Sequence, residues 1–134
     1  MDYMEVALAE ARRAKSRGEV PIGAVIVRDG RIIAKAHNKR ELKQNALYHA
    51  EVLAINRACK KRKSWRLDDC EMYVTLEPCQ MCMGAITNAR IATLYIGARS
   101  NTDLNWKTEV VYSENQECSK ILKDFFARAR KHPQ

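Results

Sequence analysis

The chain has 134 residues, 46% apolar and 30% charged, which suffices for one hydrophobic core but not for two, so we expect residues 1–134 to form a single domain. The longest apolar run, residues 20–27, is too short to cross a bilayer, and no export signal is visible, so we expect no membrane partner and a cytoplasmic location. The net charge of +8 indicates either a polyanionic partner or a well-solvated surface.

A helix and a β-hairpin are predicted at the start of the chain. Small and apolar residues recur at helical spacing over residues 2–16. Residues 21–27 and 31–36 follow as two strands joined by Asp29 and Gly30, a dipeptide that tolerates the positive φ angles of a tight turn. We therefore expect an antiparallel pair of strands after the first helix.

The middle of the chain predicts a helix and then a strand, a helix and a strand. The first of these helices should begin near His49 and end at the basic run 60–63, where cations suit the negative end of the helix dipole. Residues 72–76 and 92–97 are predicted as strands on either side of a helix over residues 79–90. Such a unit implies that its two strands pair in parallel, within a mixed sheet covered by helices.

A fifth strand and a last helix are predicted at the end of the chain. Only about ten residues, 98–107, separate the fifth strand, residues 108–112, from the fourth. Because a parallel crossover needs roughly a dozen residues or more, we expect the fifth strand to run antiparallel to the fourth. Ser113 and Gln116 are suited to a capping box. The last helix then carries an apolar stripe that we expect to be buried: Cys118, Ile121, Leu122, Phe125, Phe126 and Ala129.

Two short motifs place soft metal ligands at the starts of two predicted helices. His49 and Glu51 could not share a face in mid-helix, but at the first turn both side chains can point beyond the helix end. Cys79 and Cys82 share a face of the next helix, which Pro78 is suited to start. His49, Cys79 and Cys82 therefore predict a catalytic zinc site whose fourth position is left for water.

Glu51 stands beside these ligands in the expected role of a base. Helix N-termini lower the cost of the two thiolates. Zinc held by two thiolates and one imidazole still lowers the pKa of bound water toward about 7, which makes hydroxide available for attack. Glu51 could take a proton from that water, pass it to a ring nitrogen of the substrate and then protonate the departing amine. This arrangement favours hydrolytic deamination.

The residues His49-Ala50-Glu51 and Pro78-Cys79-Gln80-Met81-Cys82 resemble the signature of the zinc-dependent cytidine-deaminase superfamily. Segments 19–25, 64–67 and 73–79 are further similar to the bacterial tRNA-specific adenosine deaminases, which convert adenosine to inosine at the wobble position. This likeness covers roughly residues 1–98, with a weaker match in the last helix.

The resemblance implies a cytidine-deaminase-like α/β fold of three layers, with a five-stranded mixed sheet covered by helices on both faces. It also implies one zinc ion per chain, tRNA as the partner and a homodimer. Glu51 matches the residue that shuttles protons in that family, and Asn38 matches an asparagine that contacts the target nucleoside.

Two departures from the family bear on the substrate. The family usually has Pro-Thr-Ala before the histidine, where this chain has residues 46–48, and Tyr48 could stack on a base. The family's Gly-rich loop and helix after the fourth strand are missing from residues 98–107. A free nucleoside or nucleobase such as guanine, cytosine or adenosine is therefore an alternative substrate, and a noncatalytic nucleic-acid-binding module is a third reading.

The motif residues have other possible uses. A Cys-x-x-Cys pair that opens a helix is also the layout of a thioredoxin-like redox site, but such a site has no need of His49 or Glu51. A structural zinc site would want a fourth protein ligand, and neither His37 nor His132 has the spacing to provide it. The remaining cysteines are predicted to be small buried hydrophobes: Cys59, Cys70 and Cys118.

The sequence leaves the roles of His37 and of two groups of basic residues undecided. His37 either lines the crevice beside Asn38 or is a hydrogen-bonded structural residue. The basic residues 60–63, and the basic residues 128–131 of the last helix, are either solvated helix surface or contacts to phosphate.

Overall fold

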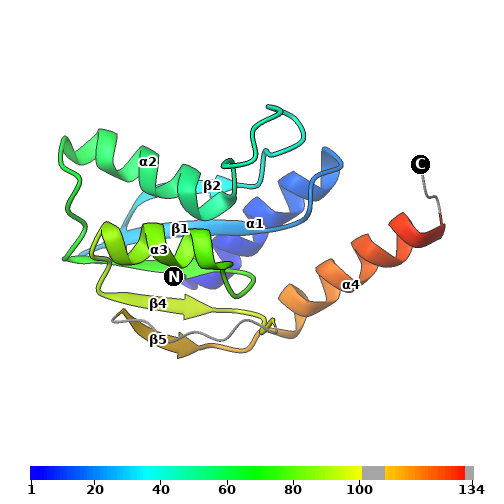
Figure 1. Ribbon diagram of the computed structural model, residues 1–134. Coiled ribbons are helices and arrows are strands. Elements are labelled where there is room, and N and C mark those ends of the chain that lie inside the picture. The colour runs from blue at the N-terminus through cyan, green and yellow to red at the C-terminus, as the bar shows by residue number, and fades with distance from the viewer. Residues whose placement is uncertain (101–107, 132–134) are drawn as a thin grey trace.

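The computed structural model describes residues 1–100 and 108–131. One mixed sheet runs through these residues in the order β2-β1-β3-β4-β5 (Figure 1). β1 is antiparallel to β2 and β3, whereas β3, β4 and β5 are parallel. None of the described helices is long and apolar enough to span a membrane. In chain order the elements are α1 (Tyr3–Ser16), β1 (Gly23–Arg28), β2 (Arg31–His37), α2 (Ala50–Arg62), β3 (Cys70–Val74), α3 (Gln80–Asn88), β4 (Thr93–Ile96), β5 (Glu109–Tyr112) and α4 (Gln116–Lys131).

Helices cover both faces of the sheet, which confirms the three-layer arrangement. Ala24 and Ile26 of β1 pack into one core with residues of α2 and α3. Val25 and Val27, the alternate residues of the same strand, pack into a second core with residues of α1 and α4. Successive side chains of a strand point to opposite faces, so β1 has to be apolar along its whole length.

The predicted hairpin forms, and it packs tightly against α1. Asp29 and Gly30 have φ angles of 50° and 72°, which are the positive values that a two-residue hairpin turn requires. At Gly23, where β1 begins, an added Cβ would overlap the carbonyl oxygen of Ala7 and lie 2.7 Å from the backbone nitrogen of Ala11. Only glycine lets the helix approach the strand this closely.

The fifth strand runs parallel to the fourth, so the predicted antiparallel orientation is wrong. Each of the two strands has four residues, and the chain therefore returns only about 10 Å along the strand direction. The observed strand ends leave residues 97–108 for this return, which reaches the roughly dozen residues that a parallel crossover needs. Most of this connection, residues 101–107, lies outside the described residues.

The last helix differs from its prediction at both ends. Asn115, rather than Ser113, caps α4, because its side-chain oxygen accepts the backbone N–H groups of the first turn. The apolar stripe is buried only in its first half, where Cys118 and Leu122 join the core, whereas Phe126 is 44% exposed. Figure 1 shows why: the second half of α4 projects past the edge of the sheet and has no sheet to cover.

Candidate metal centre and catalytic carboxylate

Two helix starts carry the predicted ligands. His49 is the N-cap residue of α2, and Cys79 is the N-cap residue of α3. Both residues have an extended backbone, and neither side chain caps its own helix. Cys82 follows in the first turn of α3 and is fully buried. Both cap side chains are therefore available for something other than helix capping.

The three ligand atoms lie close together. Nδ1 of His49 lies 3.8 Å from Sγ of Cys79 and 3.5 Å from Sγ of Cys82, and all three atoms lie within 4.8 Å of one another. A tetrahedral zinc ion, with bonds of about 2.3 Å to sulfur and 2.0–2.1 Å to nitrogen, holds such ligands about 3.5 Å apart. The spacing fits a metal ion, and Nδ1 is the ring nitrogen that faces both sulfurs.

The surroundings of His49 and Cys82 favour the neutral forms of these two side chains. Desolvation and then the nearby charge of Arg40 lower the pKa of His49, and a neutral imidazole is the form that binds a metal. Burial raises the pKa of the Cys82 thiol. Because a thiol must lose its proton to bind a metal, metal binding at Cys82 should release a proton.

Glu51 lies in the first turn of α2 with its carboxyl group beside Cys82. The residue is only 3% exposed, and its Oε1 atom has no hydrogen-bond partner among the described residues. Desolvation raises the pKa of Glu51 to about 7, although its own backbone amide and the Cys82 side chain act in the opposite direction. A buried carboxyl group with a free oxygen atom at this place can both accept and donate a proton at neutral pH.

Asn38 and Tyr48 stand at the two ends of the loop that leads into His49. The N–H group of Lys39 donates to the Tyr48 carbonyl at 3.0 Å and so closes this loop. Oδ1 of Asn38 accepts the N–H group of Arg40 at 3.2 Å, while its amide nitrogen lies 3.5 Å from a backbone carbonyl. Tyr48 is half-buried and packs against the core on the α2 side. Contacts of both residues with a substrate stay predictions.

Glu19 holds the same loop from the other side, a role that the sequence did not reveal. It is 1% exposed, and its two carboxylate oxygens accept the N–H groups of Glu41 at 3.1 Å and Leu42 at 2.5 Å. These partners lie 22 and 23 residues further along the chain. No local pattern in the sequence identifies such a contact.

Glu77 fixes the segment that carries the two cysteines. Its Oε1 accepts both the N–H and the hydroxyl group of Ser100 at 3.1 Å, and its Oε2 accepts the Tyr112 hydroxyl at 2.5 Å. Parallel strands bring their carboxyl ends to one edge of the sheet, so Tyr112 at the end of β5 lies near the end of β3. An antiparallel β5 would have carried Tyr112 to the opposite edge, which is why this contact was missed.

His37, Cys59, Cys70 and Cys118 do not belong to the cluster of candidate metal ligands, and His132 lies outside the described residues. Nδ1 of His37 lies 3.2 Å from Oε1 of Glu10, and both side chains are buried. His37 is therefore hydrogen-bonded through Nδ1, as one of its two predicted roles requires, while its buried Nε2 has no partner among the described residues. Cys70 and Cys118 are buried in the two cores, and burial raises their pKa values to about 11 and 12. Cys59 is half-buried and packs against the first core. The prediction that these cysteines are small buried hydrophobes is confirmed for Cys70 and Cys118, whereas Cys59 is only half-buried.

Comparison with known proteins gives consistent relatives. A family model of MafB19-like deaminases matches residues 1–130. A tRNA-specific adenosine deaminase of Bacillus subtilis (strain 168) is 42% identical over 96% of this chain and 89% of that protein. A tRNA-specific adenosine deaminase of Aquifex aeolicus (strain VF5) is 39% identical over 96% of this chain and 94% of that protein.

Solved structures share the fold as well. One, from studies of A-to-I editing by tRNA:A34 deaminases at the wobble position, has a TM-score of 0.84 and 40% identity, and covers 90% of this chain and 98% of that chain. A guanine deaminase from Bacillus subtilis has a TM-score of 0.69 and 29% identity, and covers 98% of this chain and 94% of that chain.

Proposed function

Because the chain belongs to the MafB19-like deaminase family, we propose that it converts adenosine to inosine in tRNA, at the wobble position. The observation that carries this proposal is the convergence of His49, Cys79 and Cys82 beside the buried carboxyl group of Glu51. The choice of tRNA as the substrate is supported by the 39–42% sequence identity to tRNA-specific adenosine deaminases over 96% of the chain.

Zinc is the metal that we propose for this site, one ion per chain. Two cysteine sulfurs and one imidazole nitrogen form a soft donor set that zinc favours. Three protein ligands leave one tetrahedral position open, as in catalytic rather than structural zinc sites. When bound, zinc would supply a Lewis acid that activates the attacking water.

Glu51 is the proposed proton carrier. Its carboxylate accepts a proton from the attacking water and delivers it to a ring nitrogen of adenine. It then takes the second proton of the same water and passes it to the amine, which leaves as ammonia, while the oxygen of the water stays on the ring. Because Glu51 is 3% exposed, bulk water has little access to the proton on this path.

Asn38 and Tyr48 are the proposed contacts to the target nucleoside. The base has to leave its stack to reach the metal ligands, and both residues border the loop that ends at His49. The long 3.5 Å contact of the Asn38 amide nitrogen is easily exchanged for a hydrogen bond to a ribose hydroxyl. Tyr48 is half-buried, so part of its ring is left for a base.

A free nucleobase is the second candidate substrate. The observation that favours it is the likeness to a guanine deaminase at 29% identity, over 98% of this chain. Selectivity within this fold depends on pocket walls and loops rather than on the metal ligands, so the two substrates need a direct comparison.

That comparison uses the zinc-loaded protein. It is incubated with unmodified tRNA bearing adenosine at the wobble position and, separately, with free adenosine, guanine and cytosine. We expect mass spectrometry to show the gain of about one dalton that replaces an amine by oxygen in tRNA alone. Conversion of free guanine with unchanged tRNA would favour the second candidate.

A homodimer and a cytoplasmic location remain predictions, supported by the resemblance to tRNA adenosine deaminases. Light scattering on the purified protein measures the first directly. A purely nucleic-acid-binding role has less support, because such a protein has no chemical use for the unpartnered carboxyl oxygen of Glu51 beside the metal ligands.

A further inference from the structure

An exposed tryptophan lies at the end of α2 that is far from the metal ligands. α2 begins next to His49 and runs for 13 residues to Arg62, so its two ends are about 20 Å apart. The segment 63–69 then leads down to β3, at the left of Figure 1. Trp65 in this segment is 58% exposed. A large aromatic side chain left in solvent is a candidate for contact with a partner.

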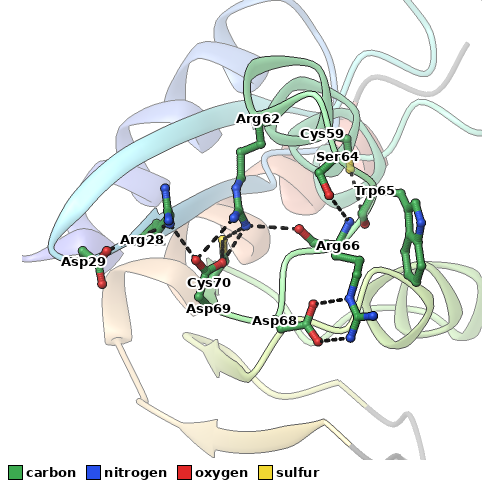
Figure 2. Close-up of polar contacts among 10 residues, drawn as sticks. All are labelled: Arg28, Asp29, Cys59, Arg62, Ser64, Trp65, Arg66, Asp68, Asp69 and Cys70. Atoms are coloured by element: carbon green, nitrogen blue, oxygen red, sulfur yellow. Dashed lines mark hydrogen bonds and ion pairs between the residues drawn. The ribbon is translucent and has the colours of Figure 1, made fainter.

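The segment around Trp65 is held in place. The Ser64 hydroxyl accepts the N–H group of Arg66 at 3.1 Å, and the Arg62 guanidinium donates to the Arg66 carbonyl at 3.1 Å (Figure 2). The Cys59 thiol donates to the carbonyl of Trp65 itself. The ring is therefore presented on an ordered turn, and a ligand that stacks on it need not first order the backbone.

Two of the nearby arginines are already neutralised. Arg66 makes a two-pronged ion pair with Asp68 at 3.0 and 2.9 Å, and Arg62 makes one with Asp69 at 2.6 and 3.3 Å (Figure 2). The guanidinium carbon of Arg66 lies 5.5 Å from the centre of the Trp65 ring. These ion pairs stabilise the turn and neutralise the charges of its two acidic residues, Asp68 and Asp69.

Further exposed cations lie close to Trp65 in the chain or beside its ring. Lys60 and Lys63 are within five residues of Trp65, and the guanidinium carbon of Arg90 lies 5.9 Å from the centre of its ring. All three are exposed, and within residues 1–100 and 108–131 none of them forms a salt bridge. Lys61 instead lines a pocket with residues of the β1–β2 hairpin. The surface thus combines one exposed aromatic ring with three cations that form none of the described salt bridges.

We propose that Trp65, Lys60, Lys63 and Arg90 form a second RNA contact, in which an unpaired base stacks on Trp65 and the cations bind the flanking phosphates. Sequence-tolerant binding of single strands uses this combination of an aromatic platform and a basic track. A protein partner of apolar character would instead bury these cations without partners, which is costly. The choice of RNA among polyanions rests on the proposed function, but the contact takes no part in the reaction.

Tryptophan fluorescence reports on the stacking. The chain has two tryptophans, so Trp106→Phe leaves Trp65 as the single tryptophan, which is excited selectively over the tyrosines. The zinc-loaded, full-length protein is titrated with a short single-stranded oligoribonucleotide whose anisotropy reports binding independently. We expect saturable quenching that parallels the anisotropy. Binding seen by anisotropy without any quenching would overturn the stacking.

Variants test the affinity. Trp65→Ala should weaken binding of the oligoribonucleotide by about tenfold, the effect of losing one stacked base, and Trp65→Phe should restore most of it. The double change Lys60→Gln and Lys63→Gln should flatten the slope of log affinity against log salt by about 1.4, at roughly 0.7 per lost phosphate contact.

A matched double change on α1 serves as the control: Arg12→Gln and Lys15→Gln. It removes the same charge from another part of the surface and should change the slope much less. Equal affinity and slope for wild type and both test variants would overturn the proposal. So would a Trp65→Ala protein that loses self-association but still binds RNA as wild type does. Failure of the proposed function appears differently, as wild-type protein that forms no inosine whether or not it binds RNA.

Discussion

Replacement of Glu51 by glutamine should abolish turnover while the metal ligands stay intact. The amide matches the carboxyl group in size, and Oε1 of Glu51 has no hydrogen bond to lose among the described residues, so the fold should be preserved. The amide cannot carry a proton. General acid–base catalysis contributes about 10²–10⁴-fold, or roughly 3–5 kcal/mol of barrier. Glu51 serves two successive proton transfers, so we expect a loss of about 10³-fold or more.

The assay is single-turnover formation of inosine in tRNA, combined with elemental analysis of bound zinc. Glu5→Gln is the matched control, because Glu5 is an exposed residue in the first turn of α1, and it should keep the wild-type rate. A Glu51→Gln protein that holds zinc and retains more than about a tenth of the wild-type rate constant would refute the role of Glu51 as proton carrier.

Three further predictions concern the metal and the frame around it. Chelation should abolish deamination, and added zinc should restore it in wild type but not in Cys82→Ser, since the serine hydroxyl is a poor substitute for a thiolate ligand. Gly23→Ala should lower the free energy of unfolding, measured in denaturant, by about 1–3 kcal/mol because the added methyl group overpacks the contact with α1. Gly84→Ala is the control and should not destabilise the protein, because its Cβ would meet nothing within 4 Å. Glu77→Gln should cost about 1–3 kcal/mol because one of its acceptor oxygens becomes a donor; thermal unfolding equal to wild type would contradict this.

The cluster of candidate metal ligands could be predicted because its signals are local. Pro78 and the three-residue spacing of Cys79 and Cys82 indicate a helix start with both sulfurs on one face. His49 and Glu51 can cooperate only at the first turn of a helix, and the structure places His49 at that N-cap. The geometry of two helix starts was therefore enough to predict that these four side chains meet at one site.

The supports of the site could not be predicted, because they depend on contacts between distant segments. Glu19 acts on a loop more than twenty residues away. Glu77 reaches Tyr112 only because β5 is parallel to β4, and the length of the connecting segment pointed to the opposite orientation. Phe126 follows the helical repeat of a buried stripe yet lies 44% exposed, since periodicity does not tell how far the sheet extends.

The position of inosine in a tRNA substrate tests the proposed function most directly. Zinc-loaded protein is incubated with a tRNA transcript that has adenosine at the wobble position and at many others, and nuclease fragments are then analysed by mass spectrometry. The proposed function predicts inosine at the wobble position and at no other adenosine. A transcript that stays unmodified throughout, in the presence of fully zinc-loaded protein, would contradict it.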